Sequence, residues 1–244
     1  MSAVSNLKVK LFADGADLAG IKEMAANPAI KGFTTNPTLM RKAGVADYKA
    51  FALQALQVVS GRPISFEVFA DEFGEMEKQA HEIASWGKNV YVKIPVMNTR
   101  REFSGPLVER LARAGVQVNV TALMTGDQVK QVTERLAPDT PAIISVFAGR
   151  IADTGRDPMP IMAASVKAMK ARPKAELIWA SPRELLNIFQ AGDVGCHIIT
   201  ATTDILKKLS LVGKDLDDYS LETVEMFYKD AKAAGYSIAT RAAA

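Results

Sequence analysis

The sequence predicts an α/β protein built as a parallel (β/α)8 barrel, a TIM barrel, with an additional C-terminal helix. Short apolar runs rich in β-branched residues alternate along the chain with segments of helical periodicity. Successive strand centres lie roughly 20 to 35 residues apart, the length of one βα unit. Eight such units in 244 residues fit one barrel. The main alternative is a doubly wound open sheet, which the strand count and the lack of a glycine-rich turn after the first strand disfavour.

The predicted strands are almost continuously apolar, as expected for parallel strands that are covered on both faces. They cover Lys8–Ala13, Gly32–Asn36, Ile64–Phe69, Val90–Val96, Val116–Leu123, Ala142–Phe147, Glu176–Ala180 and Cys196–Ala201.

The predicted helices have apolar residues spaced three and four apart, which marks one buried face. They include Tyr48–Val59, Glu72–Trp86, Leu107–Ala114, Gln128–Leu136, Met159–Lys170, Arg183–Gln190 and Asp204–Leu209. A further amphipathic helix over Leu221–Ala234 could pack on its own barrel or cross to a neighbour. We expect residues 1–238 to form a single barrel domain and residues 239–244 to form a loose C-terminal tail.

Composition and charge exclude several classes of protein. The net charge of +3 is too weak a bias to indicate a nucleic-acid partner. The single cysteine, Cys196, excludes an intramolecular disulfide framework and fits a reducing compartment. No apolar run is long enough for a signal-peptide core at the N-terminus or for a membrane span elsewhere. We therefore expect a cytoplasmic protein without a membrane partner.

Polar residues occur near the carboxyl ends of seven predicted strands, which is the catalytic face of such a barrel. Their spacing of two within a strand places them on one face, so neighbouring pairs can point into the barrel together. A lone buried Ser or Thr is usually structural, but polar residues at the same level of seven strands indicate a site. They are Asp14, Thr34, Asn36, Glu67, Lys93, Asn119, Thr121, Ser145 and Ser181.

Lys93 is the most informative of these residues because it interrupts a run of strand-forming residues, Val90–Val96. Lysine is almost never buried without a partner or a purpose. One reading is an edge lysine that reaches solvent. The other is a nucleophile, since a desolvated lysine can attack a carbonyl and form a Schiff base. The iminium then draws electrons from the adjacent C–C bond, so an aldol bond breaks without a metal.

Two acids at strand ends could move the protons of such a reaction. Glu67 lies among Phe66, Val68 and Phe69, where a solvated acid is not expected. A carboxylate near the lysine could pass protons through a water while the carbinolamine forms and dehydrates. Asp14 could carry the proton of the substrate hydroxyl, although its place before Gly15 also fits a simple turn.

Two arginines suggest that the substrate carries phosphate. Arg150 follows the sixth predicted strand, and Arg183 follows Ser181 and Pro182. We expect Ser181 to cap a helix in which Pro182 is the first residue, and a helix N-terminus with an arginine suits a phosphate group. An ordinary cap with a surface arginine is the alternative. Solvated loop charges are expected at Arg100, Arg101 and Arg156.

Taken together and in this order, six segments resemble the transaldolase family of class I aldolases. They are Phe12–Asp14, Lys31–Thr38, Val92–Pro95, Asn119–Thr121, Ser145–Arg150 and Ala180–Arg183. The resemblance runs through nearly the whole predicted barrel. The chain length is similar to that of the short branch of the family, which also contains fructose-6-phosphate aldolases.

The resemblance implies a (β/α)8 barrel that moves a dihydroxyacetone unit between sugar phosphates of the pentose phosphate pathway. We expect no cofactor and no metal, because the iminium is already the electron sink and the sequence offers two histidines and no cysteine cluster. It implies that Lys93 is the Schiff-base nucleophile and Asp14 the acid/base residue, and that Glu67 and Thr121 hold the catalytic water. Dihydroxyacetone hydroxyls would be bound by Asn36, Asn119 and Ser145, and phosphate by Arg150, Ser181 and Arg183. We also expect Thr34 and Phe147 among the substrate-binding residues.

Two positions separate the activities within the family. Fructose-6-phosphate aldolases resemble this chain but have Gln and Tyr where it has Glu67 and Phe147, so a transferase is favoured over a lyase. Met97 and Leu123–Met124 depart from the usual residues and leave the acceptor sugar open. A non-catalytic sugar-phosphate binder is disfavoured because it needs no buried lysine. We expect a homo-oligomer whose subunit number the sequence does not give.

Overall fold

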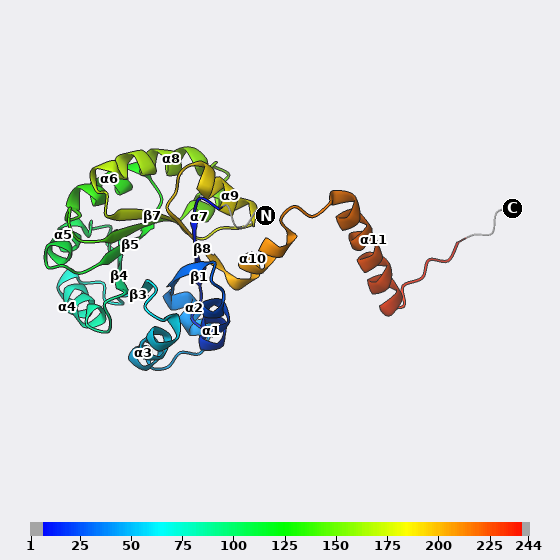
Figure 1. Cartoon of the computed structure of the whole chain (residues 1–244), viewed down its shortest axis with the longest axis horizontal. Coiled ribbons are helices and arrows are strands. Elements are labelled where there is room, and N and C mark those ends of the chain that lie inside the picture. The colour runs from blue at the N-terminus through cyan, green and yellow to red at the C-terminus, as the bar shows by residue number, and fades with distance from the viewer. Residues whose placement is uncertain (1–6, 241–244) are drawn as a thin grey trace.

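The computed structural model describes residues 7–240 as a closed barrel of eight parallel strands that are paired in chain order, with helices around it (Figure 1). The predicted fold class is therefore confirmed. The strands are β1 (Lys10–Asp14), β2 (Ile30–Thr34), β3 (Ile64–Glu67), β4 (Val90–Pro95), β5 (Val118–Leu123), β6 (Ala142–Val146), β7 (Ala175–Trp179) and β8 (Ile198–Thr202).

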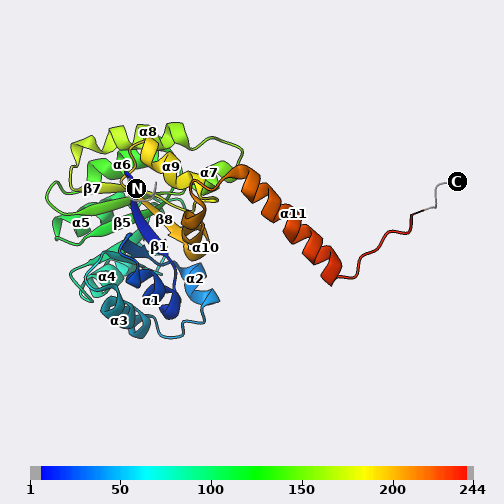
Figure 2. The same ribbon diagram turned by 45° about the vertical axis from the view of Figure 1, so that its right-hand side comes forward.

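Helices follow each strand, and all but the last of them, α11, lie on the outside of the barrel (Figure 2). They are α1 (Leu18–Ala26), α2 (Pro37–Lys42), α3 (Tyr48–Val59), α4 (Phe73–Ala84), α5 (Gly105–Arg113), α6 (Gly126–Arg135), α7 (Ala148–Asp153), α8 (Met159–Ala168), α9 (Leu186–Asp193), α10 (Thr203–Lys207) and α11 (Leu216–Ala233). The short 3-10 helices η2 (Met169–Ala171) and η3 (Lys208–Leu211) follow α8 and α10.

The predicted apolar stripe of the fourth helix is buried. Met76, Ala80 and Ile83 of α4 are at most 3% exposed and belong to the large core between strands and helices. Helix α3 has the predicted bounds, with Asp47 as its N-cap. The helical segments α1, α2 and α7 are additional to the predicted helices.

A second, smaller core fills the inside of the barrel beneath its carboxyl end. It contains Phe12, Ile143, Ile178, Ala180 and Ile198. Residue 32 must be glycine here, because a Cβ atom at Gly32 would lie 2.3 Å from Cζ of the Phe12 ring. This layer closes the barrel below the polar residues, so their side chains face an opening only at the carboxyl end.

The second strand lies two residues earlier in the chain than predicted, at Ile30–Thr34 instead of Gly32–Asn36. β2 ends at Thr34, and Asn36 instead caps α2, its Oδ1 accepting a hydrogen bond from the Leu39 N–H at 2.9 Å. Pro37 then takes the first helical position, where its missing N–H costs nothing.

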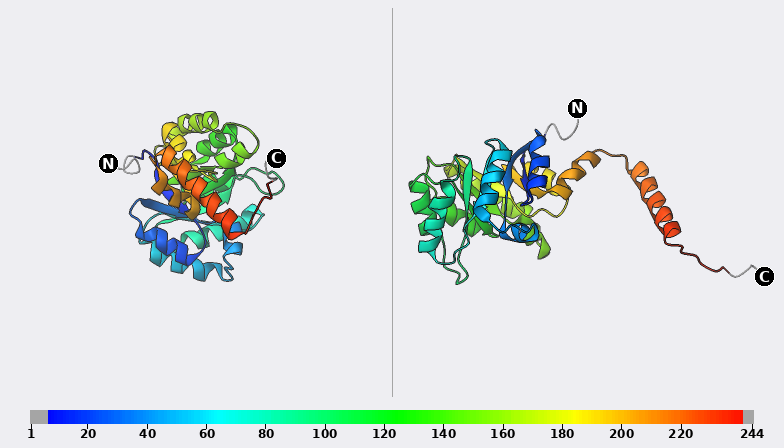
Figure 3. Two further views of the ribbon diagram at one scale, coloured as in Figure 1. Left: turned by 90° about the vertical axis from the view of Figure 1, so that its right-hand side faces the viewer. Right: turned by 90° about the horizontal axis from the view of Figure 1, so that it is seen from below.

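Helix α11 begins at Leu216, five residues before the predicted start, and extends away from the barrel (Figure 3). None of its residues is buried, and its large apolar side chains are exposed. The expected single domain over residues 1–238 stays a prediction. The expected tail, 239–244, falls partly outside the described residues, which end at 240.

Candidate active site

A cavity of about 570 Å³ opens at the carboxyl ends of the strands. It is lined by residues of β1 to β6 and β8, of helices α2 and α7, and of the loop that follows β7. Every predicted site residue except Asn119 lines it: Asp14, Thr34, Asn36, Glu67, Lys93, Thr121, Ser145, Phe147, Arg150, Ser181 and Arg183. Met97 and Met124, which differ from the residues usual in the resembling family, pack against the hydrophobic core and are not part of the lining.

Lys93 lies inside the barrel and is only 6% exposed, so the reading of an edge lysine that reaches solvent is wrong. Its Nζ donates to the Thr35 carbonyl at 2.9 Å and lies 3.3 Å from Oε2 of Glu67. The strand register explains the pairing, because Lys93 of β4 is directly opposite Glu67 of β3. An amine and a carboxylate are thereby held side by side at the base of the cavity.

Asp14 is the second acid of the cavity and lies in a net of hydroxyl groups. Thr34 Oγ1 donates to Asp14 Oδ1 at 2.8 Å, and Asn36 Nδ2 approaches Oδ2 at 3.5 Å. Because Thr34 has one hydroxyl hydrogen, Thr200 must donate to it across 2.5 Å. Burial raises the pKa of Asp14, although Lys93, Thr34 and Asn36 act to lower it. A carboxyl group of this kind is suited to carry a proton.

Asn119 supports the cavity from below instead of lining it. Its Nδ2 donates to Ser65 Oγ at 3.0 Å, and its Oδ1 accepts from Ser145 Oγ at 2.7 Å. The side chain is fully buried. The chain of bonds fixes the Ser145 hydroxyl at the cavity wall.

Thr121 presents a hydroxyl that is free to bind a small polar molecule. Its Oγ1 is buried and has no hydrogen-bond partner among residues 7–240. Unpaired buried polar groups are costly, so a hydroxyl left in this state beside a cavity indicates a ligand or a water as its partner.

The structure corrects the predicted helix cap at Ser181. α9 begins at Leu186, and Ser181 has a left-handed backbone with φ of 60°. The segment between them is a loop because Asn187 Oδ1 accepts from the N–H groups of Arg183 and Glu184 at 2.8 and 3.2 Å. Ser181 contributes to the site in another way, since its Oγ accepts from Arg183 Nη1 at 2.9 Å.

Arg183 is held in place from two sides. Besides Ser181, its guanidinium binds both carboxylate oxygens of Asp153 at the end of α7, with Nε donating to Oδ1 at 2.8 Å. The hydrogen bonds from Arg183 are the main reason that the pKa of Asp153 is lowered. The planar fork is thus oriented before any ligand arrives.

A close backbone approach brings helix α7, which carries Arg150, against the loop that carries Arg183. A Cβ atom at Gly149 would lie 1.6 Å from the Ser181 carbonyl oxygen, so only glycine fits there. Arg150 stacks over the Phe147 ring at 5.3 Å from its centroid. The cavity lining then holds four basic side chains, Lys42, Lys93, Arg150 and Arg183, and two acids, Asp14 and Glu67, which favours an anionic ligand.

Several residues of the site were missed from the sequence. Lys42 and Thr200 line the cavity, Ser65 holds Asn119, and Asp153 holds Arg183. A polar residue mid-strand on β8 was a detectable signal for Thr200. The sequence carries no signal for the role of Asp153, because this residue lies 30 residues from its partner Arg183. Arg100, expected as a solvated charge, is half exposed and pairs with Asp71, Glu72 and Glu102.

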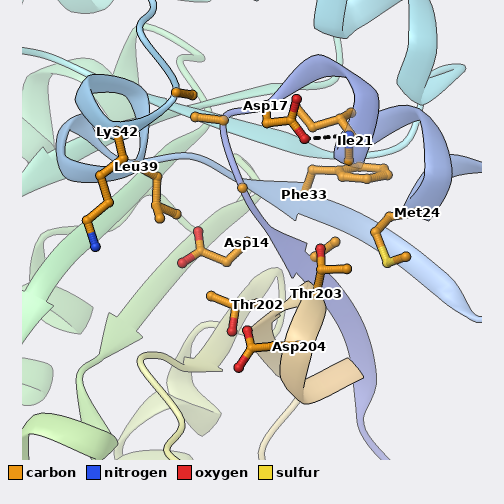
Figure 4. A pocket seen from close by; sticks show the side chains of 15 residues that line it. Asp14, Asp17, Ile21, Met24, Phe33, Leu39, Lys42, Thr202, Thr203 and Asp204 are labelled. Atoms are coloured by element: carbon orange, nitrogen blue, oxygen red, sulfur yellow. Dashed lines mark hydrogen bonds between the residues drawn. The ribbon is translucent and has the colours of Figure 1, made fainter. Parts of the chain in front are cut away.

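A second cavity, of about 400 Å³, also has Asp14 among the residues that line it (Figure 4). Its walls are mainly apolar and include Ile21, Met24 and Phe33. Asp14, Leu39 and Lys42 line both cavities, so the Asp14 carboxylate stands at the boundary between them.

In the part of the chain from 7 to 240, no helix is long and apolar enough to cross a membrane. Over the same range, no group of three or more His, Cys, Asp or Glu side chains is arranged to hold a metal ion. The expectation that the protein needs neither metal nor cofactor stays a prediction.

Fold and site together define a (β/α)8-barrel protein with a buried lysine–carboxylate pair beneath a basic cavity mouth. The chain belongs to the Transaldolase/Fructose-6-phosphate aldolase family, whose model matches residues 11–240. It is therefore an aldolase- or transaldolase-type enzyme. Predicted membership of this family is confirmed.

Curated relatives of similar length carry the name "Probable transaldolase". One from Dehalococcoides mccartyi is 33% identical over 202 residues, covering 82% of this chain and 90% of the relative. One from Clostridium acetobutylicum is 33% identical over 93% of this chain and 99% of the relative. A solved dihydrodipicolinate synthase family protein from Coccidioides immitis shares the fold alone, with a TM-score of 0.58 and 13% identity over 88% of this chain and 76% of that one.

Proposed function

We propose that the protein is a transaldolase of the pentose phosphate pathway. It transfers a dihydroxyacetone unit from a ketose phosphate, sedoheptulose 7-phosphate or fructose 6-phosphate, to an aldose phosphate, glyceraldehyde 3-phosphate or erythrose 4-phosphate. One observation carries the proposal: a lysine that is 6% exposed, with a carboxylate 3.3 Å from its Nζ, lies at the base of a cavity with a basic mouth. The names of the relatives support the same reaction.

In the first step Lys93 Nζ attacks the ketose carbonyl at C2 and forms a carbinolamine, which loses water to give an iminium. The proton that reaches the leaving hydroxyl passes from Glu67 through a water. Glu67 Oε2 is close enough to Nζ for this relay, and the unpaired Thr121 hydroxyl is the second group able to hold the water.

In the second step the C3–C4 bond breaks and its electrons move into the iminium, giving an enamine on Lys93. Asp14 removes the proton from the C4 hydroxyl and the first aldose leaves. The raised pKa of Asp14, caused mainly by burial, lets this carboxyl group hold the proton until the acceptor arrives. The enamine carbon then attacks the acceptor aldehyde, Asp14 protonates the new hydroxyl, and water releases the product from Lys93.

Other residues of the cavity hold the substrate. Asn36 and Ser145 present an amide and a hydroxyl to the dihydroxyacetone unit, and Thr34 borders the same space. Asn119 acts through Ser145. Arg150, Ser181 and Arg183 form the phosphate site at the mouth, where Phe147 supports Arg150.

Replacing Arg183 by alanine is expected to lower kcat/KM selectively for phosphorylated acceptors. A charge-assisted contact to phosphate contributes about 1.5–3 kcal/mol, which corresponds to a roughly ten- to over a hundredfold loss. The loss should appear in kcat/KM for glyceraldehyde 3-phosphate and be small for glyceraldehyde. Arg156→Ala, which removes an exposed loop arginine, is the control and should change neither value. Equal losses on both acceptors would mean that Arg183 is structural.

A lyase that releases free dihydroxyacetone is the alternative, because the family includes fructose-6-phosphate aldolases. Phe147 lines the cavity without a hydroxyl that could help water attack the imine, which favours transfer. Cleavage of fructose 6-phosphate, measured with and without erythrose 4-phosphate, tests the proposal. We expect turnover to depend on the acceptor; equal rates in both assays would promote the lyase.

We also infer a homo-oligomer in which α11 packs on a second copy of the chain. Leu221, Val224 and Tyr228 form a stripe at helical spacing and are 58–63% exposed. Most of the stability of a helix in a protein comes from packing its apolar face, so an exposed apolar stripe on this 18-residue helix implies a packing partner. Because α11 points away from its own barrel, another copy is the partner we expect (Figure 3).

Truncation after Gly213 should therefore convert the oligomer into a monomer. Light scattering on a size-exclusion column should give a multiple of 26.3 kDa for the whole chain and a single-chain mass for the truncated one. A full-length double variant, Leu221→Glu with Val224→Glu, should behave like the truncation. An oligomer that survives both changes would contradict this role of α11.

We place the protein in the cytoplasm, where phosphorylated sugars are made and interconverted. Its partners are then small sugar phosphates, not nucleic acid or a membrane surface. The net charge of +3 and the basic mouth of one cavity support a local attraction for small anions.

A further inference from the structure

The hydroxyl of Tyr48 binds the backbone of Glu67 twice. It accepts a hydrogen bond from the Glu67 N–H at 2.7 Å and donates one to the Glu67 carbonyl at 2.9 Å. Tyr48 is the first residue of α3, so this contact joins a helix on the outside of the barrel to the end of β3. A phenol can do this because its oxygen both donates and accepts.

The contact occurs where the backbone hydrogen bonds between β2 and β3 stop. Along β3 and the residues that flank it, the backbone groups point alternately to the two neighbouring strands. The N–H groups of Ile64 and Val68 donate on the β4 side. The carbonyls of Pro63 and Ser65 accept hydrogen bonds on the β2 side, from the N–H groups of Phe33 and Thr35. By this alternation Glu67 turns its N–H and carbonyl toward β2 as well.

Among residues 7–240, no strand remains on that side to pair with them. β2 ends at Thr34, and the chain enters α2 at Pro37. The Tyr48 hydroxyl takes the place of the missing strand neighbour and satisfies both groups.

The carboxylate of Glu67 depends on this anchor. Within residues 7–240 it makes no side-chain hydrogen bond, and its closest charged partner is Lys93 Nζ at 3.3 Å. The position of its backbone therefore sets the distance between the acid and the amine. We propose that Tyr48 is a positioning residue that holds Glu67 in place for proton relay to the Lys93 centre. This inference rests on the proposed function of Lys93 and Glu67.

The ring of Tyr48 is held independently of its hydroxyl. It packs edge-on against Phe66 and Trp86, with centroids 6.1 and 5.4 Å away, and lies 4.6 Å from the Phe69 ring. Burial raises the pKa of Tyr48, so the phenol keeps its proton and can donate. Tyr48→Phe should thus remove the two hydrogen bonds and leave the aromatic packing intact.

The test is the rate at which borohydride-trappable imine forms with fructose 6-phosphate. Tyr48→Phe should slow imine formation roughly tenfold, with KM changed less than twofold, because substrate binding is untouched. In a Glu67→Gln background the same change should have less than a twofold effect, since both act on one relay. Hydrogen exchange of the Glu67 amide should quicken in Tyr48→Phe, which checks the anchor without activity.

Trp86→Phe is the matched control, because it alters the same aromatic cluster without touching the hydroxyl. It should lower the melting temperature and leave the imine rate at the wild-type value. The inference would be overturned if Tyr48→Phe formed the imine at the wild-type rate. It would also be overturned if the substitution slowed imine formation as much in the Glu67→Gln background as it does alone. Failure of the wild type itself to form an imine would instead overturn the proposed function.

Discussion

Replacing Lys93 by methionine is expected to abolish turnover of fructose 6-phosphate, lowering kcat by at least about 10⁴-fold. The reason is chemical: methionine has no amine, so neither the carbinolamine nor the iminium can form. Because the Lys93 side chain is buried inside the barrel, methionine, which is apolar and of similar length, should keep the barrel intact. Circular dichroism and the melting temperature check the fold, and an acceptor-coupled assay measures the activity.

Lys10→Met is the matched control. Lys10 is also a strand lysine, but it lies at the opposite end of the barrel, is exposed and pairs with Glu176 at 2.7 Å. Its replacement should leave kcat unchanged. Residual activity of Lys93→Met within tenfold of the wild type would show that another group is the nucleophile.

Replacing Asp14 by asparagine is expected to lower kcat by roughly 10²–10⁴-fold, the usual contribution of a positioned general acid or base. Asparagine has nearly the same shape and can still accept the hydrogen bond from Thr34, so the cavity should keep its form. Asp17→Asn is the control, because Asp17 is exposed and caps α1, a role that asparagine also fills. A loss of less than threefold in Asp14→Asn would remove Asp14 from the mechanism.

The same substitution should not weaken the fold at neutral pH. Burial raises the pKa of Asp14 above its ordinary value of 3.8, so the folded chain binds this proton more tightly than the unfolded chain does. Ionised Asp14 therefore lowers stability, and stability is regained as the pH falls through the folded-state pKa. Asp14→Asn should melt at the same temperature as the wild type or higher at pH 7.5. The difference should shrink towards pH 4, as scanning fluorimetry would show; a lower melting temperature at pH 7.5 would contradict it.

The barrel could be predicted because its strands are buried on both faces. Runs such as Val90–Val96 are then nearly all apolar, and a lysine within one of them is conspicuous. The site residues could be predicted for a related reason: parallel strands end at one face, so polar residues at their ends gather there. Asp14, Glu67 and Lys93 come from three strands and line one cavity.

Contacts between loops could not be predicted in this way. Ser181 has the sequence of a helix cap, yet Asn187 holds the following N–H groups in a loop and delays the helix. The partner of Arg183, which lies in the loop after β7, is Asp153 at the end of α7, and the close approach at Gly149 brings that helix and that loop together. Such pairings depend on three-dimensional geometry that has no fixed spacing along the chain.

Depth within the barrel was equally hidden. Asn119 and Thr121 are two residues apart on the same strand face, yet Thr121 lines the cavity and Asn119 lies beneath it. Period two gives the face of a strand but not the level at which the cavity floor lies. For α11 the pattern showed an amphipathic helix and could not show what its apolar stripe packs against.

The most direct measurement for the central claim is peptide mapping by mass spectrometry after borohydride reduction with fructose 6-phosphate. We predict an added mass that matches a reduced dihydroxyacetone unit on the peptide that contains Lys93. Erythrose 4-phosphate added before the borohydride should remove this label, because the acceptor takes the unit from the enzyme. A label on a different lysine, or one that the acceptor does not deplete, would contradict transfer through Lys93.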